Sequence, residues 1–183
     1  MRTDTAIVTM LVASFAACSP TTEEAAPAFG AGENVSPFAI GSLQAASLRD
    51  AAFAPANDNM TLAINVTKAD VDALLTAAGL ATDVLQLSVQ PLIVRTPDRV
   101  LLFDTGNGPS GMLSASMATA GVEPAEVTDI FISHSHGDHV GGLVDADGAL
   151  AFPNADIHIS VNEWAAMQAN AQLASLVTAI SPR

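Results

Sequence analysis

The most informative segment of this sequence is Ser133-His134-Ser135-His136-Gly137-Asp138-His139. It follows directly after Asp129-Ile130-Phe131-Ile132, a short apolar run bounded by polar residues, which predicts a buried strand. Three histidines and one aspartate lie within the six residues 134–139, a density that is hard to explain by packing. Imidazole nitrogens and carboxylate oxygens are the donors of zinc and similar ions, so the segment predicts a metal site.

The spacing within the segment indicates how the donors divide. His134 and His136 are two residues apart, so in an extended chain both imidazoles point to the same side. Two converging imidazoles make half of a tetrahedral zinc site. Gly137 lets the chain turn, which would bring Asp138 and His139 to a neighbouring position and begin a second site. This donor set suits zinc, iron or manganese.

Paired ions explain what such a site can do. Two metals about 3.5–4 Å apart can hold a bridging hydroxide and polarise the bond that it attacks. Asp138 is the candidate catalytic residue, because its carboxylate can orient that hydroxide. Gly141 and Gly142 would let the following backbone pack closely beneath the site. The predicted metal ligands are His134, His136, Asp138 and His139.

Three further residues have alternative interpretations. Asp104 follows an expected strand and either caps its own turn or serves as a carboxylate that orients a ligand histidine. His158 lies between two isoleucines, which favours an ordinary strand position over metal ligation. Trp164 is better explained as a packing residue than as a substrate contact.

The rest of the sequence indicates the α/β class, because strand and helix patterns alternate. The clearest helix is expected at 68–78, with Thr67 as its cap, apolar residues at helical spacing and Gly79 after its end. Further strands are expected at 40–46, 61–66, 85–89, 92–94, 99–103, 129–132 and 156–160. Further helices are expected at 110–120, in a short turn at 123–126, and from Ser160 or Asn162 to about residue 171.

Composition excludes some functions. The formal net charge is −13, with 19 acidic and 6 basic residues among 183, so the surface would repel nucleic acid. A small-molecule substrate is therefore expected. The single cysteine, Cys18, rules out an intramolecular disulfide and a Cys-rich zinc site.

The N-terminus predicts export. Residues 1–18 combine a short charged start with an apolar stretch at 7–17, which is typical of a signal peptide. Cys18 follows Ala16-Ala17 as in a bacterial lipoprotein signal, with a plain secretory signal or an incidental apolar terminus as alternatives. Residues 19–36 are then a flexible tether. We expect a periplasmic protein, or one anchored to the outer membrane through a lipid on Cys18.

The segments Asp104-Thr105-Gly106 and His134 to Gly142 resemble those of the metallo-β-lactamase superfamily. Smaller similarities, among them Phe152-Pro153-Asn154-Ala155 and Glu163-Trp164, resemble its branch that contains methyl parathion hydrolase. The resemblance implies an αβ/βα sandwich with two divalent ions, expected to be zinc. It assigns His134 and His136 to the first ion and Asp138 and His139 to the second.

The resemblance also implies ligands that these residues do not supply: a further histidine, a bridging aspartate and a last histidine, all well downstream. No histidine follows His158 in the 183 residues. We therefore expect residues 37–183 to be the N-terminal portion of a truncated domain. The whole enzyme would be a metal-dependent hydrolase in which a metal-bound hydroxide attacks an ester, lactone, phosphotriester or amide.

A second hypothesis is that the chain is a non-catalytic product, either a weak metal binder or a half-domain that pairs with another chain. Half a sandwich would leave an apolar sheet face open, which predicts self-association. A Gly-His-Thr-like segment encoded after the codon for Arg183 would favour the first hypothesis.

Overall fold

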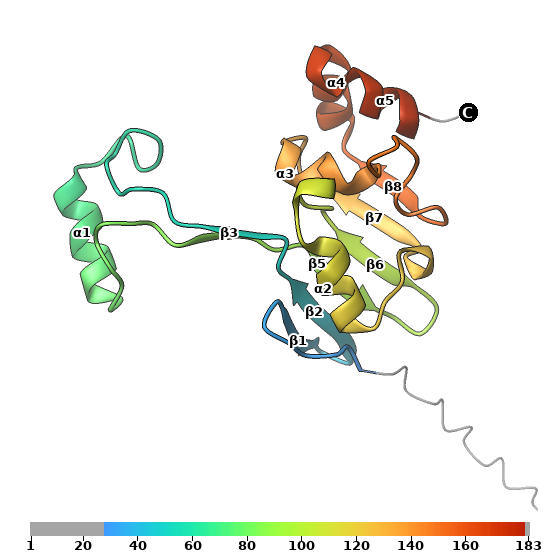
Figure 1. Ribbon diagram of the computed structural model, residues 1–183, viewed down its shortest axis with the longest axis horizontal. Helices are drawn as coiled ribbons and strands as arrows, with labels where there is room; N and C mark the ends of the chain where they lie inside the picture. The colour runs from blue at the N-terminus through green and yellow to red at the C-terminus, as the bar shows by residue number, and fades with distance from the viewer. Residues whose placement is uncertain (1–27, 182–183) are drawn as a thin grey trace, which may run out of the picture.

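The computed structural model describes residues 28–181, which form a mixed α/β fold, as predicted. A six-stranded sheet has the order β1-β2-β5-β6-β7-β8, and β3 and β4 form a separate ribbon (Figure 1). The strands are β1 Val35–Ile40, β2 Leu43–Leu48, β3 Ala51–Phe53, β4 Leu87–Val89, β5 Leu92–Arg95, β6 Val100–Phe103, β7 Asp129–Ile132 and β8 Asp156–Ile159. The α-helices are α1 Lys68–Ala77, α2 Leu113–Ala120, α3 Gly137–Val140, α4 Val161–Ala169 and α5 Ala174–Ile180. Single 3₁₀ turns are η1 Gly108–Ser110, η2 Pro124–Glu126, η3 Gly141–Leu143 and η4 Ala171–Leu173.

Strand direction determines where the site lies. The pairs from β1 to β6 in the sheet are antiparallel, whereas β6, β7 and β8 run parallel. Parallel strands bring their carboxyl ends to one edge of a sheet, where open α/β sheets bind ligands. The loops that follow Phe103, Ile132 and Ile159 therefore meet at this edge.

One face of the sheet carries the hydrophobic core. Ile93, Leu102 and Ile130 occupy neighbouring strands, and each is at most 1% exposed. Leu113 and Met117 of α2 belong to the same buried cluster. Burial of such side chains contributes about 1.5–3 kcal/mol each, so α2 and this face stabilise one another.

The opposite face is open among the described residues. Phe103 and Phe131 are each 36% exposed, and Phe38 and Ile40 of β1 are exposed on the same face. The ring of Phe131 stacks between those of Phe103 and His158, with centroid distances of 5.3 and 4.5 Å. The predicted apolar face is therefore present, whereas the self-association expected from it stays a prediction.

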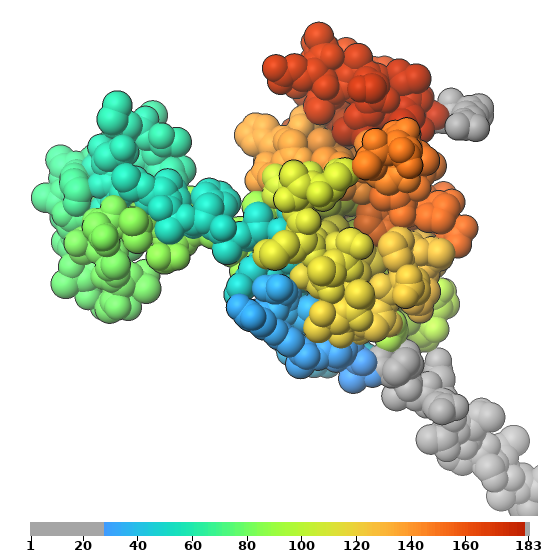
Figure 2. All heavy atoms as spheres, viewed as in Figure 1, coloured from blue at the N-terminus to red at the C-terminus, as the bar shows by residue number. Residues whose placement is uncertain are grey.

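Residues 54–86 project from the body as an arm that the β3–β4 ribbon connects to the sheet (Figure 1). Figure 2 shows the arm standing apart from the rest of the molecule. It carries α1, which has no buried residue, and the exposed side chains of Met60 and Ile64. The predicted helix is confirmed, and Thr67 caps it by accepting a hydrogen bond from the Asp70 N–H at 3.2 Å.

The prediction of a strand at 61–66 is wrong. These residues form bends and turns on the arm, and no strand lies beside them. The Asn59 side chain donates to the carbonyls of Ala63 and Val66, at 2.8 and 3.1 Å. Alternating polarity predicts a strand only where a neighbouring strand completes its hydrogen bonds.

Two predicted boundaries also differ. The strand expected at 40–46 is a hairpin, because Gly41 turns the chain with φ +61° between β1 and β2. The helix expected at 110–120 begins at Leu113, after the 3₁₀ turn η1.

The tether expected at 19–36 is too long at its C-terminal end. Phe29 is buried, and the Arg95 guanidinium lies 4.7 Å above its ring centroid. The Gly30 N–H donates to the Ala120 carbonyl at 3.0 Å. Residues 29–36 therefore belong to the folded unit, because apolar burial and this hydrogen bond attach them to α2.

The predicted signal peptide at 1–18, including Cys18, and the tether up to residue 27 lie outside the described residues. Among the helices of residues 28–181, none combines the length and apolarity needed to cross a membrane.

Candidate metal site

The four predicted ligands lie together where β7 ends. His134 and His136 belong to the segment that leaves β7, and His136 is the N-cap of α3. Their ring centroids are 4.7 Å apart, and those of His134 and His139 are 3.8 Å apart. The structure thus brings the three histidine rings into one cluster.

Asp104 connects the end of β6 to this cluster. Its carboxylate accepts from the Ser133 N–H at 2.8 Å and from the Ser133 hydroxyl at 2.7 Å. Nδ1 of His139 lies 2.7 Å from Oδ2 of Asp104 and donates to it, which leaves Nε2 for an ion. Asp104 thus binds the β7 loop and α3, as an orienting carboxylate would, although that role stays a prediction. It adopts φ +61°, a conformation that aspartate tolerates better than most residues.

Asp138 occupies the first turn of α3, with its side chain 42% exposed. Its Oδ2 atom lies 3.4 Å from Nε2 of His139. Asp104, Asp138 and His139 line a cavity of about 120 Å³ together with residues 88–91. The assignment of Asp138 as a catalytic residue stays a prediction, but its carboxylate lines this cavity beside His139, a predicted ligand.

The donor count limits what these residues can hold. Within residues 28–181, no three His, Cys, Asp or Glu side chains are arranged to hold one ion together. A catalytic zinc ordinarily has at least three protein ligands. The cluster therefore fits divalent ions in donor type and in the orientation of His139, and supplies two predicted ligands per ion.

The backbone under the cluster is closely packed, as expected for Gly141 and Gly142. The Thr105 N–H and hydroxyl both donate to the His139 carbonyl, at 2.8 and 2.9 Å. A Cβ atom on Gly142 would overlap the Thr105 carbonyl oxygen. This close approach and the two hydrogen bonds join the loop after β6 to the predicted ligand segment.

Asp50 organises the same loop, and the sequence did not point to it. Its carboxylate is fully buried and accepts from the Asn107 N–H and side-chain amide, at 2.8 Å each, and from the Leu113 N–H at 2.9 Å. Cβ atoms on Gly106 or Gly111 would collide with this carboxylate. An isolated aspartate after a strand carries no signal of partners more than fifty residues away.

In the sequence, Glu163 is informative only as part of the similarity to the methyl parathion hydrolase branch. In the structure it lies on α4 and has a specific partner, Ser135. Its Oε2 atom accepts from the Ser135 N–H at 2.8 Å and from the Ser135 hydroxyl at 2.7 Å. These hydrogen bonds, and the nearby charges of His134 and His136, lower the pKa of the Glu163 carboxyl below its usual value. The ligand segment is therefore held from α4 as well as from β6.

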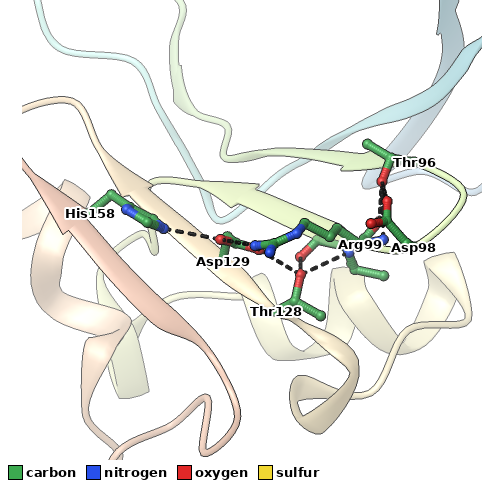
Figure 3. Close-up of polar contacts among 7 residues, drawn as sticks. Thr96, Asp98, Arg99, Thr128, Asp129 and His158 are labelled. Carbon is green, nitrogen blue, oxygen red and sulfur yellow. Dashed lines mark hydrogen bonds and ion pairs between the residues drawn. The ribbon is translucent and has the colours of Figure 1, made fainter.

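A separate polar cluster lies on the open face of the sheet (Figure 3). Asp129 accepts from Arg99 at 2.7 and 2.8 Å and from the Thr128 hydroxyl at 2.7 Å, and His158 Nε2 lies 3.0 Å away. The bonds from Thr128, His158 and Arg99 lower the pKa of Asp129 to about 2. The same pairing raises the pKa of Arg99. His158 thus faces Asp129 and Phe131, in agreement with an ordinary strand position.

A larger cavity, of about 600 Å³, lies elsewhere, between α2, η2 and residues 142–153. It includes none of the four predicted ligands, so chemistry at the histidines would use the smaller space beside Asp138. Trp164 packs against the hydrophobic core, as predicted.

Residues 86–164, which include the strands from β4 to β8 and the histidine cluster, match the family model of the metallo-beta-lactamase superfamily. Over these residues the chain is similar to members of this superfamily. Ribonuclease Z of Methanothermobacter thermautotrophicus is 44% identical over 61 residues, 33% of this chain and 19% of that protein. Metallo-beta-lactamase domain-containing protein 1 of Xenopus laevis is 32% identical over 82 residues, 45% of this chain and 33% of that protein.

Solved structures of the superfamily share the fold. AidC, described as a dizinc quorum-quenching lactonase in complex with a product, aligns with a TM-score of 0.72 and 28% identity. The alignment covers 81% of this chain and 59% of AidC. The hydrolase AbOPH of the beta lactamase superfamily aligns with a TM-score of 0.65 and 23% identity, over 78% of this chain and 50% of AbOPH.

The chain thus spans about a fifth to three fifths of the relatives that it matches. AidC, which is described as dizinc, supports the use of divalent metal among proteins of this fold. The matches do not distinguish the methyl parathion hydrolase branch from others, so that finer assignment stays a prediction.

Proposed function

We propose that this chain carries the first half of the active site of a two-metal hydrolase. The observation that supports this most is the cluster of His134, His136 and His139 at the carboxyl end of β7, with Asp104 bonded to Nδ1 of His139. A carboxylate behind a ligand histidine fixes its tautomer and raises its basicity.

In this proposal His134 and His136 hold one divalent ion, and Asp138 and His139 begin the site of another. Zinc is the ion we propose for both, because AidC is described as dizinc. When bound, such ions lower the pKa of water and polarise a carbonyl or phosphoryl oxygen. The chain's own residues supply orientation: Asp104 sets the His139 ring, and Asp138 offers an acceptor beside the open cavity.

The proposed substrate is a small ester, lactone, phosphotriester or amide. A lactone is the first to test, because AidC is described as a lactonase and aligns with a TM-score of 0.72. RNA fits less well, although ribonuclease Z enzymes are among the relatives, because a net charge of −13 repels phosphate backbones. We further propose export, with a lipid on Cys18 as the only membrane attachment.

A second candidate is a non-catalytic half-domain that binds metal weakly or pairs with another chain. Two observations favour it: the cluster offers two predicted ligands per ion, and Phe103 and Phe131 lie exposed on the open sheet face. Below three protein ligands, a catalytic zinc is not firmly held.

Metal analysis and turnover distinguish these candidates. The full chain is loaded with Zn²⁺, and bound zinc is counted for wild type and for His134→Ala and His139→Ala. Hydrolysis of an N-acyl homoserine lactone and of a nitrophenyl ester is then measured. We expect zinc binding that depends on both histidines, with turnover absent or weak in this chain alone. Two firmly held ions per chain with rapid turnover would contradict an incomplete site, and no zinc binding would contradict the metal site itself.

A further inference from the structure

Two carboxylates bind the ligand segment in the same way. Asp104 accepts from the N–H and the hydroxyl of Ser133, and Glu163 accepts from the N–H and the hydroxyl of Ser135. Each serine directly precedes a predicted ligand, His134 or His136. We call the contact between Glu163 and Ser135 the α4 clamp.

The clamp acts between the two histidines. In an extended segment, alternate side chains point to opposite sides, so holding Ser135 leaves His134 and His136 on the other side. Backbone rotation at Ser135 would separate the two rings, whose centroids lie 4.7 Å apart. A carboxylate that binds both the N–H and the hydroxyl of this one residue restricts that rotation.

The helix that supplies Glu163 is anchored independently of the histidines. Met167 of α4 is fully buried, and Trp164 packs against the core. Ser160 caps the helix by accepting from the Glu163 N–H at 3.2 Å. The clamp therefore extends from a fixed element to the metal segment across 28 residues of sequence.

The helix cap indicates that the clamp is more than a capping interaction. Ser160-Val161-Asn162-Glu163 has the pattern of a capping box, in which the glutamate side chain binds back to the N–H of the cap residue. Here Ser160 makes its half of the box, but the Glu163 carboxylate binds Ser135 instead. The carboxylate has been directed to the ligand segment rather than to the helix end.

We infer that Glu163 is a positioning residue that holds His134 and His136 in the arrangement needed to share one divalent ion. The inference rests on the proposed function, because it presumes that these histidines bind metal. Nothing in it requires Glu163 to touch the ion or the substrate.

The test uses the full chain and Co²⁺, whose visible absorption reports both binding and geometry. Glu163→Ala should weaken Co²⁺ binding about 10–100-fold, as loss of outer partners does at other metal sites. Glu163→Gln keeps an acceptor oxygen of the same reach and should restore part of the affinity. Asn162→Ala is the matched control, since Asn162 is exposed on the same helical turn, and should leave the affinity unchanged.

A second readout is independent of metal. Hydrogen exchange of the Ser135 N–H, followed by NMR in the metal-free chain, should be faster in Glu163→Ala and unchanged in Asn162→Ala. Thermal melting of the metal-free chain shows whether each variant is folded at the temperature of the assay.

The outcomes separate the two proposals. Wild-type affinity in Glu163→Ala, or unchanged exchange at Ser135, would overturn the inference and leave the proposed function intact. A wild-type chain that binds no Co²⁺ would overturn the proposed function, and Ser135 exchange would then decide alone whether the clamp positions the segment.

Discussion

Oδ2 of Asp104 lies 2.7 Å from Nδ1 of His139, although 35 positions separate them in the sequence. The contact exists because β6 and β7 are parallel neighbours, so the residue after β6 meets the helix after β7 at one edge of the sheet. The contact fixes the tautomer of the His139 imidazole, which donates from Nδ1 to the carboxylate and keeps the lone pair on Nε2.

Asp104→Asn should therefore impair metal binding more than folding. Asparagine tolerates the positive φ of this position, but its amide group can present an N–H to His139. Nδ1 would then act as an acceptor, and the proton would move to Nε2, where it blocks the ion. We expect zinc affinity to fall about 10–100-fold. Competition with a chromogenic chelator measures this, and equal affinity in the variant would contradict the role of Asp104. Asp98→Asn, in the turn before β6, serves as the control.

Asp50→Ala should destabilise the whole fold. Two donors of the half-buried Asn107 and the N–H of the buried Leu113 would lose their acceptor, and an unpaired buried group costs about 1–3 kcal/mol. We expect the free energy of unfolding in urea to fall by more than about 3 kcal/mol. Asp83→Ala, at an exposed position on the arm, should change it by less than about 0.5 kcal/mol. A small effect at Asp50 would mean that the loop after β6 is held by other contacts.

Asp129 should make stability depend on acid pH. The bonds from Thr128, His158 and Arg99 lower its pKa in the folded chain to about 2, below the value of about 4 in an unfolded chain. The carboxylate therefore stabilises the fold fully above about pH 4, and this contribution is lost as the pH falls through about 2.

Urea midpoints between pH 6 and pH 2 measure this for wild type and Asp129→Asn. The variant should be less stable at pH 6, and the difference should narrow as the pH falls from 4 to 2. A constant difference over that range would contradict the assignment. Asp156→Asn, at the exposed position paired with Asp129 on β8, is the control.

The open sheet face should promote self-association. Phe131 is 36% exposed and stacks between Phe103 and His158, and a charge at this position would have to be desolvated in any face-to-face contact. We expect wild type to form dimers or larger species in size-exclusion chromatography with light scattering, and Phe131→Glu to shift them toward monomer. Leu74→Glu changes an equally apolar side chain, 74% exposed on α1, and should have no such effect. A monodisperse wild-type monomer would contradict this prediction.

The sequence by itself determined the features that depend on near neighbours along the chain. The histidine cluster, the strand before it and the capped helix α1 were all predicted, because donor spacing, apolar periodicity and cap residues act over a few positions. The same local signals also indicated the superfamily, whose family model matches residues 86–164, a range that contains the motif at 134–139. They failed at 61–66, where alternating polarity had no neighbouring strand.

Only the tertiary structure showed which donors bind the carboxylates around the histidine cluster. Asp50, Asp104 and Glu163 come from different elements, and their partners are 28 to 63 positions away. Strand order and direction determine these pairings, and no spacing in the sequence encodes them. The physical reason is that a buried or partly buried carboxylate is stable only where N–H and O–H donors converge, and that convergence exists only once the sheet has assembled.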